Sequence, residues 1–310
     1  MNHQDISQIR IGTCVPGFVA EEWAPHMAKA GFETISINYH MSIGDANLEQ
    51  QGPHLKALLE GSGAELTTLG YYCNPIQYEE HRKTLERVID AAPLYGAQVV
   101  STFGGGYEGR PVDEAMKKFG EVYGDLAKRC QDKGLRLAIE NCPMGGTWDR
   151  VTCNIAFNPR AWTMMFNEVD NPALGLEWEP AHQMIQLIDP IAQLREWAPK
   201  IYHIHGKDAT VDWAYVKKYG VLCNTDCYAP ERTPGFGDCN WRDIIYILHR
   251  NGYEGDICVE GYHDPIYKDR WEMTAQLHAL NYLKWCRGGD FTPNPWEQKK
   301  LDYEASTQEK

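Results

Sequence analysis

Apolar positions along this chain cluster in eight short runs that are rich in β-branched and aromatic residues. Runs of this kind, bounded by polar and glycine-containing segments, are typical of β-strands. Their nearly continuous apolar character predicts burial on both faces, which favours a parallel sheet. We expect strands at residues 9–14, 32–39, 64–72, 97–103, 135–142, 174–180, 200–207 and 255–262.

The segments between these runs show a helical pattern instead. Most of them repeat apolar residues at i, i+3, i+4 and i+7, the stripe of a helix docked on a sheet. Eight strand-then-helix units predict a single (β/α)8 TIM barrel over residues 1–288. A polar C-terminal tail follows at residues 289–310. An open doubly wound sheet is the alternative, although no GxGxxG motif follows the first strand.

Composition and charge narrow the possible partners. The chain has 310 residues, of which 43% are hydrophobic and 24% charged, so it is too apolar to be disordered. Its net charge of −13 would repel a nucleic-acid backbone, and no apolar stretch is long enough for a membrane span or signal peptide. We therefore expect a cytoplasmic protein that binds neither nucleic acid nor membranes. Its ten scattered cysteines are expected to be reduced thiols.

Charged and imidazole side chains gather at the ends of the later strands. Because a TIM barrel places its catalytic groups at the carboxyl ends of its strands, these side chains should share one mouth. Three carboxylates so close together would repel one another, and a divalent cation removes that cost. Three carboxylates with one imidazole form a hard, oxygen-rich set that favours Mn²⁺, with Mg²⁺, Co²⁺ or Fe²⁺ as alternatives. The expected metal ligands are Glu140, Glu179, His205 and Glu260.

Two neighbouring residues admit a structural interpretation as well as a functional one. His203 shares a face with His205 because strand side chains alternate with period two. We assign His205 as the ligand because it lies nearer the strand end, and His203 as a packed or supporting residue. Glu177 sits deeper in its strand than Glu179, where a buried ion pair is as plausible as a role in the site.

Five motifs, in this order and spacing, carry a family resemblance. They are LAIENCPM (137–144), LGLEWEPAH (174–182), IYHIHGKD (201–208), RTPGFGDCNW (232–241) and CVEGYHDP (258–265). The chain resembles the xylose-isomerase-like sugar isomerase/epimerase family, which includes D-tagatose 3-epimerase types and inosose isomerases and dehydratases. The resemblance implies one divalent metal, often manganese, held by a Glu, an Asp, a His and a second Glu.

The chain departs from the family pattern at two places. The second ligand position normally reads DPSH, whereas this chain reads EPAH, so the ligand would be Glu179. After the last ligand the family usually reads EHEDP, whereas this chain reads EGYHDP and has one more residue. The first change affects metal preference, and the second reshapes the rim beside the substrate.

A mechanism follows from these residues. Glu140 and Glu260 can form the proton-transfer pair on a ketose or keto-polyol, removing and returning a proton beside the carbonyl. His182 resembles the family histidine that contacts a substrate oxygen. Arg232 and Lys207 are further candidates for substrate binding, although Arg232 could be a solvated loop charge and Lys207 a structural partner of Asp208.

Three other functions compete with a sugar isomerase or epimerase. The same site could act as a lyase or dehydratase on a keto-sugar, as in a 3-keto C-glycoside deglycosidase, whose similar α subunits need a small β-type subunit. A DNA-repair endonuclease would need a histidine-rich three-metal cluster and a basic face, which this sequence lacks. A non-catalytic sugar-binding protein is disfavoured by the four ligand positions. We otherwise expect a homo-oligomer with a small sugar or polyol substrate.

Overall fold

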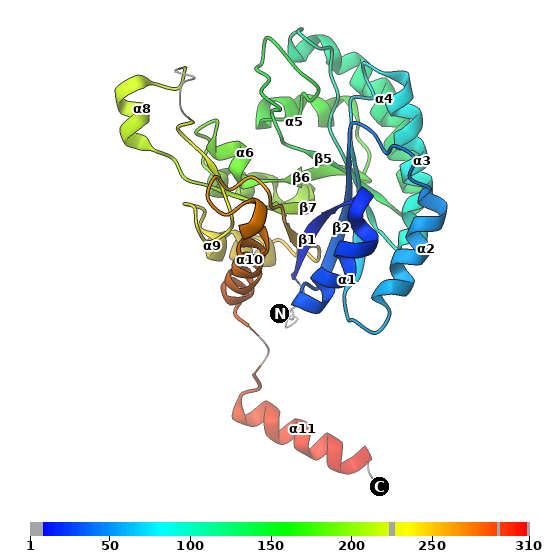
Figure 1. Cartoon of the computed structure of the whole chain (residues 1–310), viewed down its shortest axis with the longest axis vertical. Coiled ribbons are helices and arrows are strands. Elements are labelled where there is room, and N and C mark those ends of the chain that lie inside the picture. Colours follow the sequence, from blue (N-terminus) through cyan, green and yellow to red (C-terminus); the bar gives the residue numbers. More distant parts are fainter. Residues whose placement is uncertain (1–8, 223–226, 290–291, 309–310) are drawn as a thin grey trace.

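The computed structural model describes residues 9–222, 227–289 and 292–308, and its centre is a closed barrel of parallel strands (Figure 1). Each strand coincides with one of the apolar runs, so the predicted TIM barrel is confirmed. The barrel strands are β1 (Arg10–Pro16), β2 (Thr34–His40), β3 (Glu65–Tyr72), β4 (Val99–Thr102), β5 (Arg136–Glu140), β6 (Leu174–Trp178), β7 (Ile201–Gly206) and β10 (Asp256–Val259).

Strand β1 closes the barrel. Gly12 pairs with Thr34 of β2 on one side and with Cys258 of β10 on the other. Both pairings are parallel, and the remaining strands follow one another in chain order around the ring. An open doubly wound sheet would leave two edges, so this closure excludes the alternative architecture.

Helices follow the strands and form the outer layer (Figure 1). Several end on a glycine in the left-handed conformation, such as Gly31 at φ 102° and Gly96 at φ 79°, which residues with a Cβ adopt only at a cost. The main outer helices are α1 (Ala20–Ala30), α2 (Leu48–Leu59), α3 (Glu79–Tyr95), α4 (Val112–Asp132), α5 (Pro159–Glu168), α7 (Pro190–Trp197), α9 (Trp241–Arg250) and α10 (Glu272–Arg287).

The apolar core fills the space between barrel and helices. Its large, fully buried side chains include Trp162 on α5, Trp178 on β6 and Trp241 on α9. At Gly175 of β6 an added Cβ would lie 2.4 Å from the ring of Tyr202, so this strand position needs glycine. This packing holds the strands rigidly, and their carboxyl ends therefore present side chains in fixed positions.

Short helices and strands lie at the two ends of the barrel. Above the carboxyl ends lie η2 (Gly17–Val19), α6 (Pro180–Met184), β8 (Asp208–Ala209), α8 (Trp213–Tyr219), β9 (Glu231–Arg232) and η4 (Asp269–Trp271), while η3 (Ala198–Lys200) leads into β7. Strands β8 and β9 form a short antiparallel pair.

Among the described helices, none combines the length and apolar character that a membrane crossing requires.

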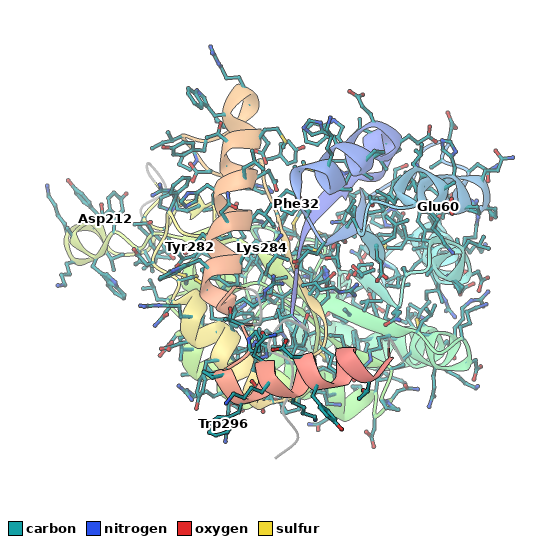
Figure 2. All side chains as sticks on the ribbon, turned by 90° about the horizontal axis from the view of Figure 1, so that it is seen from below. Phe32, Glu60, Asp212, Tyr282, Lys284 and Trp296 are labelled. Atoms are coloured by element: carbon teal, nitrogen blue, oxygen red, sulfur yellow. The ribbon has the colours of Figure 1, made fainter. Side chains whose placement is uncertain are left out.

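The described part of the C-terminal tail includes helix α11 (Pro295–Gln308), which stands apart from the barrel in Figure 1. Seen from below, Lys284 lies on α10, where its ammonium donates to the carbonyl of Gly31 at 2.8 Å, whereas Trp296 lies on α11 (Figure 2). Trp296 is 79% exposed. The nine described cysteines are all free thiols, and Cys223 lies outside the described residues.

Candidate functional site

Four strand ends bring the predicted ligands together. Glu140 is the last residue of β5, His205 lies near the end of β7, and Glu179 and Glu260 directly follow β6 and β10. One ligand atom from each of these residues lies within 4.8 Å of the others. The four residues therefore form a compact group that can hold a metal ion.

The imidazole of His205 lies among the three carboxylates. Its Nδ1 atom is 2.8 Å from Oε1 of Glu140, 3.2 Å from Oε2 of Glu260 and 3.6 Å from Oε2 of Glu179. One nitrogen therefore faces an oxygen from each of the three glutamates, as a shared ion would require.

The carboxylate oxygens of the group test whether a metal fits it. Oε2 of Glu179 is buried without a hydrogen-bond partner, whereas Oε1 of Glu179 and Oε2 of Glu260 lie 3.3 Å and 2.8 Å from the ammonium of Lys207. Three largely buried carboxylates carry more negative charge than the single ammonium of Lys207 can balance, so oxygens that converge on one point favour a further positive partner. A divalent cation with a preference for oxygen supplies one, and the residues present fit such an ion.

Lys207 is buried at the edge of this group. Its Nζ atom lies 2.8 Å from Oε2 of Glu260 and 3.3 Å from Oε1 of Glu179. Burial alone would lower the pKa of this ammonium, but the carboxylates of Glu179 and Glu260 raise it well above its usual value. Lys207 is therefore a permanent cation in the site, and its partners are these glutamates rather than Asp208.

The glutamates differ in acidity. Burial raises the pKa of Glu140 to about 7, against the opposing influence of His205. Burial also raises the pKa of Glu179, whereas Lys207 and His205 overcome burial at Glu260 and hold its pKa well below the usual value. Two carboxyl groups that both touch His205 thus favour opposite protonation states, as an acid and a base must.

His182 lies one helical turn after Glu179. Pro180 occupies the first turn of the short helix α6, where its fixed φ suits helix initiation, and Glu179 is the capping residue. Nε2 of His182 lies 3.1 Å from Oε1 of Glu179. Burial, followed by the charge of Lys207, lowers the pKa of His182 well below its usual value, so its imidazole is neutral at pH 7.

A cavity of about 600 Å³ opens above the group. Glu140, His182, His205, Lys207 and Glu260 line it, whereas Glu179 is buried behind them. The other side of the cavity is largely apolar and aromatic, and it is lined by Phe18, Tyr72, Phe103, Met144 and Tyr262. His40 also lines this cavity, while Tyr71 and Trp178 do not and are buried.

A larger hollow, of about 750 Å³, lies at the opposite end of the barrel. Its lining includes Lys56 of α2, Glu65 at the start of β3, and Gln98 just before β4. None of the described groups of candidate metal ligands lies there. The group of Glu140, Glu179, His205 and Glu260 therefore lies at the other end of the barrel from this hollow.

The family model of the xylose isomerase-like TIM barrel matches residues 25–284. The chain belongs to this family. The resemblance seen in the five sequence motifs is thereby confirmed.

The chain is similar to curated proteins in sequence and to solved proteins in structure. The inosose dehydratase of Clostridium beijerinckii is 26% identical over 282 residues, covering 85% of this chain and 88% of that protein. Among solved structures, 3-keto-D-glucoside 4-epimerase YcjR of E. coli superposes with a TM-score of 0.66 at 17% identity, covering 90% of this chain and 100% of that one. The D-allulose 3-epimerase of Methylomonas sp. has a TM-score of 0.65 at 16% identity, with coverage of 90% and 98%.

Two residues at the mouth of this xylose isomerase-like barrel were not among the predicted site residues. Glu231 of β9 and His263 lie 3.3 Å apart, between Oε2 and Nδ1. Nε2 of His263 is 3.3 Å from Oε1 of Glu260, and Nδ1 of His182 is 3.7 Å from Oε1 of Glu231. His263 belongs to the EGYHDP segment, whose extra residue was the available sequence signal.

Arg232 has a different setting from the other predicted substrate-binding residues. Its Nε donates to Oδ2 of Asp264 at 3.1 Å, and its Nη1 approaches the hydroxyl of Thr210. Arg232 is not among the residues that line the cavity, whereas His182 and Lys207 are. In this structure its evident contact is therefore an ion pair that ties the β9 segment to the loop after β10.

Beneath the ligand group lies a second set of buried polar side chains. Glu177 and His203 are both fully buried, and Nδ1 of His203 lies 2.5 Å from Oε1 of Glu177. The same oxygen accepts a hydrogen bond from the hydroxyl of Ser101 at 2.6 Å. The buried pair considered for Glu177 is therefore present, and its partner is His203.

Proposed function

We propose that this chain is a divalent-metal-dependent isomerase or epimerase that acts on a ketose, a keto-sugar or a keto-polyol. The observation that carries the proposal is the placement of Glu140, at the end of β5, and Glu260, directly after the non-neighbouring strand β10, both within 3.2 Å of the same atom of His205. The printed functions of the related inosose dehydratase, 3-keto-glucoside epimerase and allulose epimerase support a substrate of this class.

The proposed ion is held by Glu140, Glu179, His205 and Glu260, with Mn²⁺ the favoured identity. When bound, such a cation supplies a Lewis acid that increases the acidity of the C–H bond beside a substrate carbonyl. The family more often has Asp at the second ligand position. The longer side chain of Glu179 is therefore expected to alter the metal preference of this site.

Proton transfer falls to the two glutamates that line the cavity. One carboxylate accepts the proton from the carbon beside the carbonyl, and the other carboxyl group returns a proton to the opposite face of the same carbon. The outcome is inversion at that carbon with no net change in atoms or electrons. A carboxylate that holds a cation is a weak base, so the activation of the C–H bond would come mainly from the polarised substrate.

Two cavity residues are proposed to hold the substrate oxygens. The ammonium of Lys207 can donate to an oxygen that gains negative charge when the proton leaves, because it is buried and permanently charged. The neutral imidazole of His182 can donate to, or accept from, a substrate hydroxyl. Arg232 remains a proposed contact for a larger substrate that reaches the β9 segment.

Elimination is the second candidate function. It is favoured by the inosose dehydratase relative, which the chain matches over 85% of its own length. Here one glutamate would remove the same proton, and a hydroxyl or glycosidic oxygen on the next carbon would leave with a proton from the other. A 3-keto C-glycoside deglycosidase subunit, acting with a small β-type partner, would remove the same proton but would break a C–C bond, and the aglycone carbon would leave with the proton from the other glutamate.

The deciding experiment is turnover in deuterated water. The Mn²⁺-loaded chain would be incubated with a panel of ketoses, inososes and 3-keto-glucosides, and the products followed by NMR. We expect an epimer or isomer that carries deuterium at the reacting carbon. An unsaturated or cleaved product would instead establish the lyase, and no turnover by a fully metal-loaded chain would refute both.

A further inference from the structure

The two ring nitrogens of His205 face different surroundings. Nδ1 faces the three glutamates of the proposed metal site. Nε2 points to the other side, where the hydroxyl of Tyr72 lies at 3.2 Å and Oε1 of Glu177 at 3.3 Å. The imidazole thus lies between the ligand group and a separate pair of oxygens, and His205 is 1% exposed.

Glu177 is itself fixed in place by the barrel. Its Oε1 atom accepts from Ser101 of β4 and contacts His203 of β7, so strands on both sides of β6 hold it. On the far side of His203, Nε2 lies 3.3 Å from Oδ1 of Asp256, whose other oxygen accepts from Thr67 at 2.5 Å. Glu177 therefore ends a buried Asp256–His203–Glu177 row and has little freedom to move.

We propose that Glu177 and Tyr72 are positioning residues that present Nδ1 of His205 to the metal ion, an inference that rests on the proposed metal-dependent function. A neutral imidazole carries one N–H, and an ionised carboxylate can only accept a hydrogen bond. An acceptor beside Nε2 keeps the proton on that nitrogen and leaves the lone pair on Nδ1. Histidine ligands generally donate their other N–H in this way, which fixes the ring and strengthens the metal bond.

Glu177 suits this role better than that of a ligand. Glu177, His203 and His205 lie close enough to hold an ion, but the contacted oxygen of Glu177 already has Ser101 and His203 as partners. Tyr72 adds a second, independent contact from β3 and lines the cavity with its ring. Replacing either residue should loosen His205 while leaving all four proposed ligands in the chain.

The test is the Mn²⁺ affinity of two variants, Tyr72→Phe and Glu177→Gln, measured by calorimetry on the full chain. Tyr72→Phe removes the hydroxyl beside Nε2, and Glu177→Gln replaces the charged acceptor by a neutral amide, so we expect Mn²⁺ binding to weaken about 10–100-fold in each variant. The matched controls are Tyr95→Phe, which loses a buried hydroxyl bond to Gln51, and Glu33→Gln, which loses an ion pair with Arg287. Both controls should bind Mn²⁺ as the wild type does, although Glu33→Gln should be less stable.

The outcomes separate this inference from the proposed function. If the wild-type chain binds no Mn²⁺, the proposed function fails. If it binds Mn²⁺ and both folded variants bind equally well, only the positioning role is overturned. Should Glu177→Gln fail to fold, Tyr72→Phe decides, together with ¹⁵N NMR of His205 in the Mg²⁺-loaded wild type. That spectrum should show the proton on Nε2, and a proton on Nδ1 would refute the inference.

Discussion

Nε2 of His182 lies 3.1 Å from Oε1 of Glu179, and both side chains are buried in the same strand-to-helix turn. The two residues nevertheless face different neighbours. Glu179 lies behind the cavity, where Nζ of Lys207 is 3.3 Å from the same Oε1 atom, whereas His182 lines the cavity itself. Mutation can therefore distinguish the roles of these two residues, although they lie in the same turn.

Glu179→Ala and His182→Ala should fail in different ways. Glu179→Ala removes a proposed ligand, so Mn²⁺ binding and turnover should collapse together. His182→Ala should keep the metal and lose about 10²–10⁴-fold in turnover, the usual range for one positioned polar or proton-transferring group. Metal content and kcat measured on the same samples test this, and equal metal loss in both variants would contradict it.

The second prediction concerns substitutions of the other three proposed metal ligands. Glu140→Gln, His205→Ala and Glu260→Gln should each lower bound Mn²⁺ and activity by orders of magnitude while circular dichroism shows an intact fold. The control is Glu80→Gln, which alters an exposed glutamate of α3. Full metal occupancy and activity in all three ligand variants would rule out the proposed metal site.

Metal affinity should depend on pH in a definite direction. In the metal-free chain the pKa of Glu140 is raised to about 7, and that of His205 is also raised because its carboxylate neighbours outweigh burial. Both protons must leave before the metal binds, so Mn²⁺ affinity should rise between pH 6 and pH 8, by about tenfold per unit for each proton released. Calorimetry across this range tests the sign, and a flat or falling profile would contradict it.

The same raised pKa affects the stability of the metal-free chain. Because the folded pKa of Glu140 exceeds its unfolded value of 4.5, its contribution to stability is complete below the unfolded pKa and is lost as pH rises towards about 7. Bound metal reverses this trend by favouring the ionised carboxylate. The increase in Tm caused by Mn²⁺ should therefore be larger at pH 8 than at pH 6.

Nucleic acid should not bind. A net charge of −13 and a cavity edged by carboxylates oppose a phosphate backbone. Abasic duplex DNA should show no detectable binding at physiological salt in a fluorescence anisotropy titration. Micromolar binding that weakens with added salt, or nicking of the duplex, would bring back the endonuclease interpretation.

The strand-end residues were predictable because strand periodicity and parallel topology together fix where side chains point. The sequence alone predicts that Glu140, His205 and Glu260 lie at the same end of the barrel, because each lies at the end of an apolar run. Glu231 could not, because it follows a loop without apolar periodicity and reaches the site through pairing of β8 with β9. The Arg232–Asp264 pair joins two separate loops, and sequence spacing does not reveal such contacts.

Lys207 has a consequence for the number of ions that this mouth accepts. Glu179, His182 and Glu231 could hold a second ion by their spacing, but the ammonium of Lys207 lies 3.3 Å from Glu179 and 3.9 Å from Glu231. The barrel thus carries one cation that is covalently tethered and that no chelator can extract. If the proposed metal site is right, removing the metal would leave this countercharge behind, so the carboxylates would keep a fixed positive partner.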